Sequence, residues 1–498
     1  MVVSLPFRQF VQRLSRFGTR RPHSTRLRRR PSEWLVVAAE VETLESRQLL
    51  SSIVVNSTSG GENYAATVTA AQLDPAHTAV TLRDAIDAAN NTTGADTISF
   101  DSNVFPANAA GPTTIVLSGG TPLELSDKSG ATTINGPGAS QVAVSGANLS
   151  TVLVVDSGVT ATIDGLTITG GKGSINLGGG QTAAGGIENN GTLAVENSVI
   201  SGNAGGTFGG GIYNNNVITI IGCTFTGNSA QFGGGLFSAG NATINASVFD
   251  LNSAGSNGGG IYNLAAVTLE NSTLSNNTAG ANGGGLYSNN HATVIDSTIA
   301  GNSAATSGGG FINLNVVTLV DCTIAGNFST LGAGVYNPFS TVSLSGTIVA
   351  QNSVSPANLA SRDWAGQAAS AGSSYNLIGD GTNSGLANGT NHNLVGTSAS
   401  PLDPLLAPLG NNGGPTQTMA LLAGSPAIDA GGTTIPIDPI TGLSLPYDQR
   451  GAGFNRMFGS AIDIGALEQV FVPVTAGVTA PAGNVRAAWP RDGGGSPG

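Results

Sequence analysis

Residues 209–232 read GGGIYNNNVITIIGCTFTGNSAQF, and residues 233–257 read GGGLFSAGNATINASVFDLNSAGSN. The same pattern recurs from Gly185 to Asn352, and the glycine that precedes an apolar residue returns at intervals of 24 or 25 residues. A unit of this length cannot bury a core of its own, so each unit must pack against its neighbours. The stretch therefore predicts a solenoid.

Alternating apolar residues mark three short strands in each unit. The first is seeded directly after the glycine, as at Ile212, and the second carries apolar side chains on both sides of a threonine, as in Ile218 and Ile220. The third has a small residue followed two places on by an apolar one, as in Cys223 and Phe225. Period two without a helical period predicts an all-β parallel β-helix, with coils about 4.8 Å apart.

An asparagine recurs at one corner of every unit. Its side-chain amide can donate to the next amide in the stack and accept from the previous one, and asparagine tolerates a bent backbone. We interpret the column as a structural ladder rather than a ligand site; it comprises Asn203, Asn228, Asn252, Asn277, Asn302, Asn327 and Asn352.

The repeats resemble those of polymorphic outer-membrane proteins in two motifs, Gly-Gly-Gly-Ile-Tyr-Asn at 209–214 and Phe-x-x-Asn at 225–228. That resemblance implies a right-handed β-helix, the pectin-lyase-like solenoid, over residues 114–353. It says little about function.

The N-terminal region divides into a leader and a cap. Residues 1–51 are basic and include Leu44–Ser51, which resembles a motif behind the basic leaders of many secreted planctomycete proteins, so we expect export; a disordered basic arm is the alternative. Residues 52–113 contain a run, Thr81–Asn91, that resembles the CSLREA motif, with Val80 and Thr81 in place of Cys-Ser. Leu82, Ala85, Ile86 and Ala89 share one face of this run, which predicts a short helix that caps the first coil.

Residues 354–468 break the period and resemble the choice-of-anchor Q domain, found on surface-bound bacterial proteins. The resemblance rests on the motifs at 376–379, 424–431, 448–451 and 463–468. We expect this region to form further coils and, after Pro401, to cover the second end of the solenoid, with Asp429, Asp448, Arg450 and Asp463 paired. Residues 469–498 read as a flexible tail.

Charge and composition exclude several classes of function. Nine of the 18 basic residues fall in residues 1–30, so the rest of the chain carries nine against 29 acidic residues, a formal net charge of −20. Such a body disfavours nucleic acid. No apolar run is long enough to span a membrane, and two cysteines in 498 residues indicate buried free thiols rather than a disulfide framework. We expect a secreted or cell-surface monomer.

The best candidate for a catalytic constellation is Asp296 and Asp321, in one column on consecutive coils, with Glu270 one column away. Carboxylates about 5 Å apart can act as a pair or hold calcium. Against this, turn positions often carry Asp, and Asn197 and Asn271 share the column. The four histidines lack metal-ligand spacing, so no other metal or cofactor is predicted.

An aromatic column follows the first strand position of the units. If the apolar residues beside it point inward, alternation sends these rings outward, where they offer a surface for a glycan or a surface protein; packing to stiffen the sheet is the alternative. The column comprises Tyr213, Phe237, Tyr262, Tyr287 and Tyr336. Two hypotheses remain: a surface protein with an adhesive, glycan-binding or structural role, and a polysaccharide lyase or glycoside hydrolase acting on an extracellular polysaccharide.

Overall fold

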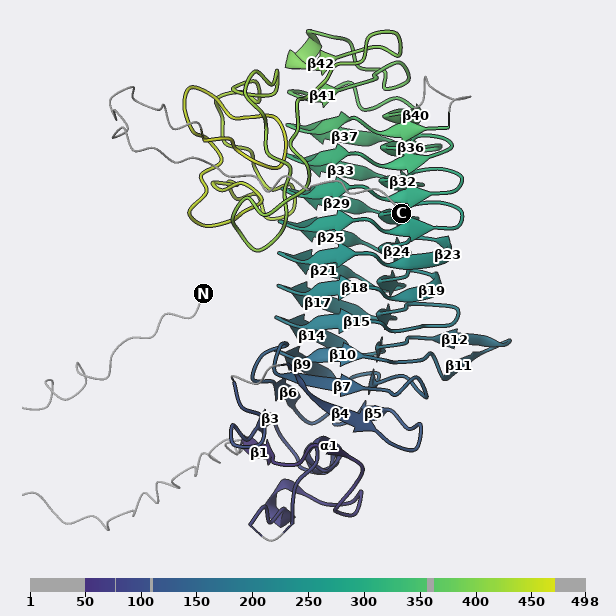
Figure 1. Cartoon of the computed structure of the whole chain (residues 1–498), viewed down its shortest axis with the longest axis vertical. Helices are drawn as coiled ribbons and strands as arrows, with labels where there is room; N and C mark the ends of the chain where they lie inside the picture. The colour runs from purple at the N-terminus through teal and green to yellow at the C-terminus, as the bar shows by residue number, and fades with distance from the viewer. Residues whose placement is uncertain (1–49, 77, 108–110, 356–361, 471–498) are drawn as a thin grey trace, which may run out of the picture. The chain divides into compact units, whose positions relative to one another are not determined.

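The computed structural model describes residues 50–76, 78–107, 111–355 and 362–470. These residues belong to one compact unit that begins at Gln48. Almost all of the predicted leader and all but two residues of the predicted tail lie outside the described residues. Within the unit, the chain winds into coils stacked along one axis (Figure 1), which confirms the predicted right-handed parallel β-helix.

Two long parallel sheets run the length of the described stack. Sheet A consists of β1 (Ser51–Val55), β3 (Asp96–Phe100), β6 (Ala131–Asn135), β9 (Thr160–Asp164), β14 (Thr192–Glu196), β17 (Val217–Ile221), β21 (Ala242–Asn245), β25 (Val267–Glu270), β29 (Ala292–Ile295), β33 (Val317–Val320) and β37 (Val342–Ser345). Sheet B consists of β2 (Ser59–Gly60), β4 (Thr113–Leu117), β7 (Val142–Ser145), β10 (Thr167–Thr169), β15 (Val199–Ser201), β18 (Thr224–Thr226), β22 (Val248–Asp250), β26 (Thr273–Ser275), β30 (Thr298–Ala300), β34 (Thr323–Ala325), β38 (Ile348–Ala350), β41 (Leu377–Ile378) and β42 (Leu394–Val395).

Two shorter sheets complete the coils. Sheet C consists of β5 (Leu123–Leu125), β8 (Leu153–Val155), β13 (Ile187–Asn189), β16 (Ile212–Asn214), β20 (Leu236–Ser238), β24 (Ile261–Asn263), β28 (Leu286–Ser288), β32 (Phe311–Asn313), β36 (Val335–Asn337) and β40 (Trp364–Gly366). Sheet D consists of β19 (Ser229–Phe232), β23 (Ser253–Asn257), β27 (Thr278–Ala279), β31 (Ser303–Ala304), β35 (Phe328–Ser329) and β39 (Ser353–Val354). An antiparallel hairpin of β11 (Ile175–Gly178) and β12 (Gln181–Ala183) leaves the stack within a glycine-rich stretch of the sequence.

The N-terminal end is closed by helix α1 (Leu82–Asn90), with a short 3₁₀ turn at Ala70–Gln72 nearby. Thr81 caps the helix by accepting from the backbone N–H of Asp84, while Asp84 accepts from the backbone N–H of Thr81. The apolar face packs on β1, β3 and β5. The parallel ladder already starts at β1, well before residue 114, because Ile53 and Ile98 supply the inward side chains of the first coils.

The corner asparagines are buried and joined coil to coil. From Asn203 to Asn352, each Nδ2 donates to the Oδ1 of the next asparagine at 2.9 to 3.0 Å, and each backbone N–H donates to the same oxygen. Each Nδ2 also donates to a backbone carbonyl, as from Asn277 to Phe249. The ladder ends where Asn352 donates to the Asp363 carboxylate. Cys223 and Cys322 are free and buried, as predicted, and burial raises the pKa of both thiols to about 12.

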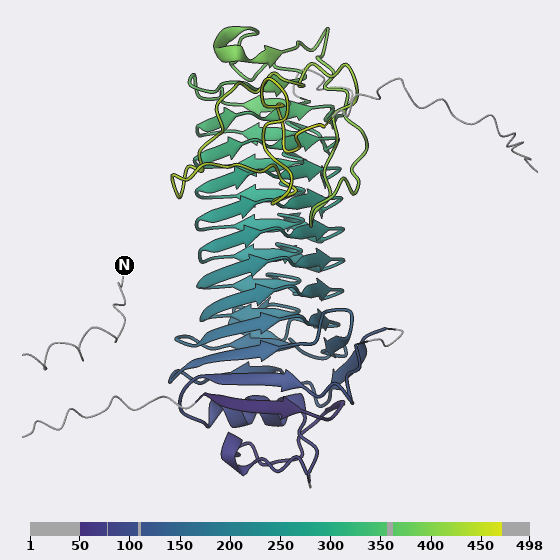
Figure 2. The same ribbon diagram turned by 90° about the vertical axis from the view of Figure 1, so that its left-hand side faces the viewer.

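Residues 403–469, here called the flanking segment, correct one prediction. They do not cover the end of the solenoid but lie along the outer side of sheet B beside β26 to β41 (Figures 1 and 2). The reason is a second apolar core, because the outward residues of sheet B turn apolar in the last coils. Ala325, Ile348, Ala350 and Leu377 of the coils are buried there against Leu406, Leu421, Ala427 and Ile464 of the flanking segment.

Candidate functional site

The aromatic column lies on the outer face of sheet C. Strand pairing places Tyr213, Phe237, Tyr262 and Tyr287 in register on consecutive coils, with Ile312 and Tyr336 continuing the line. Their neighbours Ile212, Leu236, Ile261 and Leu286 are buried in the core. The rings therefore point away from the core, as strand alternation predicts.

The rings are stacked on one another rather than freely exposed. The centroid distances are 5.5 Å between Tyr213 and Phe237, 5.0 Å between Phe237 and Tyr262, and 4.6 Å between Tyr262 and Tyr287, with interplanar angles of 21°, 8° and 7°. The side chains of Phe208 and Phe232 flank the stack. The faces are thus occupied by other rings, and a ligand meets ring edges and hydroxyl groups instead.

The tyrosine hydroxyls of this column are unused by the fold. Among the described residues, none makes a hydrogen bond with the hydroxyl of Tyr213, Tyr262, Tyr287 or Tyr336, and none of these oxygens is buried without a partner. Burial of the rings raises the pKa of Tyr213 and Tyr287, and that of Tyr262 to about 12. Each of these three hydroxyls therefore keeps its proton at physiological pH and can donate as well as accept.

Carboxyl groups stand at the N-terminal end of the column. Glu188 is in register with Tyr213, and Glu124 is in register with Val154, the residue paired with Glu188. Burial raises the pKa of Glu188 and of Glu124, and the negative charge of Asp156 raises both further. Glu188 is only 4 % exposed, and its Oε2 has no hydrogen-bond partner. This end of the column therefore repels polyanions.

The predicted catalytic trio is not an open site. Asp296 and Asp321 occupy a turn between sheets A and B, with φ of 45° and 50°, and are 2 % and 1 % exposed. Glu270 ends β25 in register with Ile295 and accepts a hydrogen bond from Asn245, so its carboxylate is engaged outside the pair. The turn requires the left-handed region, which Asn, Asp and Gly tolerate best, and this accounts for the carboxylates in that column.

Arg456 of the flanking segment sits directly on this pair. Its Nη2 donates to Asp296, its Nε lies 3.7 Å from Asp321 Oδ2, and its Nη1 donates to the carbonyl of Gly465 at 2.9 Å. The side chain is fully buried, and burial lowers its pKa to about 10. Burial also raises the pKa of Asp321, with the Glu468 carboxylate adding to the shift.

A calcium ion does not fit the trio, since a guanidinium already supplies the positive charge between the two carboxylates. Over the part of the chain that the structure describes, no group of three or more His, Cys, Asp or Glu side chains is arranged to hold a metal ion. No local pattern in the sequence indicates this contact, because Arg456 is 160 residues from Asp296.

The other polar residues predicted to pair lie within the flanking segment. Arg450 Nη2 is 2.6 Å from Asp448 Oδ2, and Asp463 accepts from the backbone N–H of Asp429. Gln449 donates to the hydroxyl of Thr273 and accepts from that of Thr298. These contacts hold the segment together and fix it to β26 and β30. No helix among the described residues is long and apolar enough to cross a membrane.

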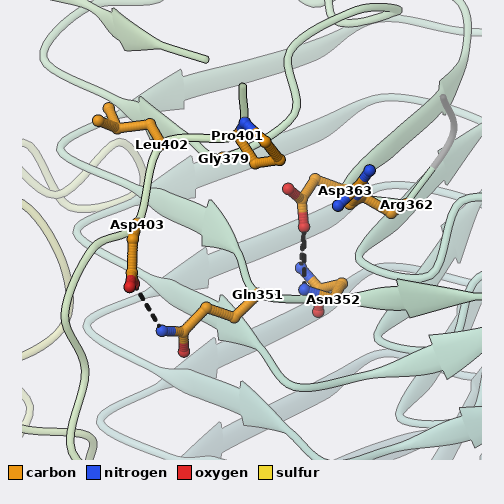
Figure 3. A pocket seen from close by; sticks show the side chains of 8 residues that line it. All are labelled: Gln351, Asn352, Arg362, Asp363, Gly379, Pro401, Leu402 and Asp403. Atoms are coloured by element: carbon orange, nitrogen blue, oxygen red, sulfur yellow. Dashed lines mark hydrogen bonds between the residues drawn. The ribbon is translucent and has the colours of Figure 1, made fainter. Parts of the chain in front are cut away.

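An open pocket of about 340 Å³ lies where the asparagine ladder ends (Figure 3). Asp363 accepts two bonds from Asn352 and one from the backbone N–H of Asp380, while Arg362 Nε lies 3.3 Å from Asp380 Oδ2. Gln351 and Asp403 face each other across the other side at 2.9 Å. Burial raises the pKa of Asp363 to about 6, and the nearby Asp380 carboxylate adds to the rise. The pocket therefore holds a carboxyl group that changes protonation in the mildly acidic range.

Comparison with known proteins gives little beyond the fold. No known family's sequence profile matches this chain, and no curated protein matches it. A solved structure titled "Crystal structure of pectate lyase Pel9A" is similar in outline, with 14 % sequence identity, a TM-score of 0.39, and coverage of 85 % of this chain and 97 % of that chain. The strand pairing of the chain itself shows an all-β parallel β-helix, and the function has to be argued from the surface of this protein.

Proposed function

We propose that this protein is a secreted, cell-surface-associated β-helix that binds an uncharged or basic extracellular polysaccharide along sheet C. One observation carries the proposal: four tyrosine hydroxyls stand in one outward line without a protein partner, and three of them belong to stacked rings. Three of them can both donate and accept, and the four hydroxyls lie one or two coils apart, at about 4.8 Å per coil, because Phe237 and Ile312 interrupt the row. A linear polymer of hydroxyl-bearing rings presents groups that can meet hydroxyls at such intervals.

The charge of the protein further restricts the class of polysaccharide that sheet C can bind. The body has a formal net charge of −20 beyond residue 30, and Glu124 and Glu188 stand at the head of the column. A polyuronate would meet repulsion along this face, whereas a neutral or amino-sugar polymer would not. The resemblances of residues 1–51 to exported leaders and of residues 354–468 to the choice-of-anchor Q domain support an extracellular, surface-attached setting. The alternative ligand for this face of sheet C is a surface protein.

The test replaces all four tyrosines, Tyr213, Tyr262, Tyr287 and Tyr336, with phenylalanine. This keeps the ring stack and removes only the hydroxyls, so the melting temperature should stay close to that of the wild type. Binding to a panel of insoluble neutral, amino-sugar and uronate polysaccharides should be seen for the wild type with the first two classes and be lost in the variant. Equal retention of both proteins would refute the proposal.

A polysaccharide lyase or glycoside hydrolase is the second candidate, favoured by the pocket of Figure 3. Asp363 has a pKa near 6 in an open pocket lined also by Arg362, and acid–base catalysis uses such a carboxyl group. Assays for new reducing ends and for unsaturated products should then show turnover that Asp363→Asn abolishes. Wild-type protein that binds a polysaccharide without releasing either product would eliminate this candidate.

A further inference from the structure

The last two coils of sheet B carry an unusual residue choice at one turn position. In the preceding seven coils the residue before the buried small residue lies in the left-handed backbone region, and it is Asn197, Gly222, Ala246, Asn271, Asp296, Asp321 or Gly346. The strand register continues this position to Tyr375 and His392, two residues before the paired Leu377 and Leu394. Their φ angles are 56° and 61°.

A bulky residue in this region carries backbone strain that glycine or asparagine would avoid. The core does not need an aromatic ring there, because seven earlier coils close the same turn without one. The neighbouring asparagines perform the structural task, since Asn376 N and Nδ2 both donate to Asn393 Oδ1. Closure of the turn therefore does not account for the two aromatic rings on this strained backbone.

The two rings form a flat platform. Their centroids are 4.6 Å apart and their planes differ by 4°. Gly432 of the flanking segment packs against Tyr375, since a Cβ atom there would lie 3.1 Å from the ring. His392 is exposed, and neither of its ring nitrogens bonds to a described residue. One face of the imidazole rests on Tyr375, and the other is left for a ligand.

A groove of about 540 Å³ surrounds this platform, between the last coils and the flanking segment. Asp429 borders it, exposed and with φ of 53°; its Oδ1 accepts from Ser460 and from the backbone of Ala461, and no described residue bonds its Oδ2. The volume suits a ligand of one or two rings. Flat apolar surface beside a carboxylate acceptor is the combination that a pyranose ring uses, with one face for stacking and hydroxyls for donation.

We propose that the groove formed by Tyr375, His392 and Asp429 binds a single neutral pyranose unit, either free or at the end of a glycan chain. The site is separate from the tyrosine row on sheet C. It requires no enzymatic activity and does not depend on the tyrosine row being a binding surface.

The experiment titrates full-length protein with methyl glycosides of glucose, galactose, mannose and N-acetylglucosamine, followed by saturation-transfer NMR and calorimetry. His392→Gly should weaken binding about tenfold, the loss expected for one stacking contact. Because glycine suits this backbone, its melting temperature should equal or exceed that of the wild type. Asp429→Asn should weaken binding while the ring protons of the glycoside still receive saturation from the protein.

The matched control is Ala246→Gly, which makes the same kind of replacement at the same turn position in a distant coil. It should leave glycoside binding unchanged. Absence of binding to any glycoside at millimolar concentration, or equal affinity in His392→Gly and the wild type, would overturn the proposal. The variant in which all four tyrosines of sheet C are replaced by phenylalanine should keep glycoside binding. This result distinguishes failure of this site from failure of the tyrosine row.

Discussion

At the scale of single residues, one turn position explains why Asp296 and Asp321 form a column in the sequence but no open catalytic site in the structure. From Asn197 to Gly346 the position between sheets A and B takes Gly, Asn or Asp in all coils except that of Ala246, because its φ is positive, so Asp296 and Asp321 look in sequence like a stacked catalytic pair. In the sequence, an aspartate that suits a turn is the same residue as an aspartate that serves in catalysis. Only the packing of Arg456 against both distinguishes them.

Arg456 offers the sharpest test at this scale. Arg456→Met leaves two buried carboxylates without their counter-charge, and we expect the free energy of unfolding to fall by about 3–5 kcal/mol in urea denaturation. Adding Asp296→Asn and Asp321→Asn to that variant should restore most of the loss, because the uncompensated charges are gone. A loss below about 1 kcal/mol for the single substitution would mean that the ion pair is not what fixes the flanking segment.

At the scale of elements, the period of the repeat was enough to predict three of the four parallel sheets, but it predicted neither sheet D nor the packing of the side chains. Alternation correctly placed Ile212 in the core and Tyr213 outside it. It could not show that Phe208 and Phe232 come alongside and that the rings stack. Helix α1 was predictable because its cap and its apolar face are local features.

The asparagine ladder is the element whose energetics can be measured most cleanly. Asn277→Ala removes the acceptor for two donors of Asn252 and the donor to Asn302, all buried, so we expect a loss of about 3 kcal/mol in the free energy of unfolding. Asn276→Gly is the control, since residue 276 is exposed with φ of 52°, and it should change stability by less than about 0.5 kcal/mol. Equal effects of the two substitutions would refute the ladder's structural role.

At the scale of the whole molecule, the position of the flanking segment is the feature that differs most from the prediction. Its position depends on outward residues of sheet B becoming apolar in the last coils, from Thr323 to Ile348 and Leu377. That change is visible in the sequence but reads as ordinary strand variation until a partner is known. Contacts such as Gln449 with Thr298 join residues 151 positions apart, which no local pattern indicates.

The docking of the flanking segment should depend on pH. Burial raises the pKa of Glu468 to about 7, and the Asp463 carboxylate raises it further while Arg456 opposes the rise. A raised pKa in the folded state means that the stabilising contribution is complete below the unfolded pKa of about 4.3 and is lost as pH rises through 7. Hydrogen exchange of residues 448–468 should therefore be more protected, after correction for intrinsic rates, at pH 5 than at pH 8. Glu468→Gln should reduce that difference, and an unchanged difference would contradict the assignment.

The central claim is that the tyrosine hydroxyls on sheet C bind a polysaccharide. The most direct test varies the number of these hydroxyls. Affinity for the bound polysaccharide should be measured by calorimetry for variants in which one, two, three and all four tyrosines become phenylalanine. We expect a stepwise fall, with each lost hydroxyl costing about 0.5–1.5 kcal/mol of binding free energy, at constant melting temperature. Affinity that is independent of the number of hydroxyls would contradict the claim.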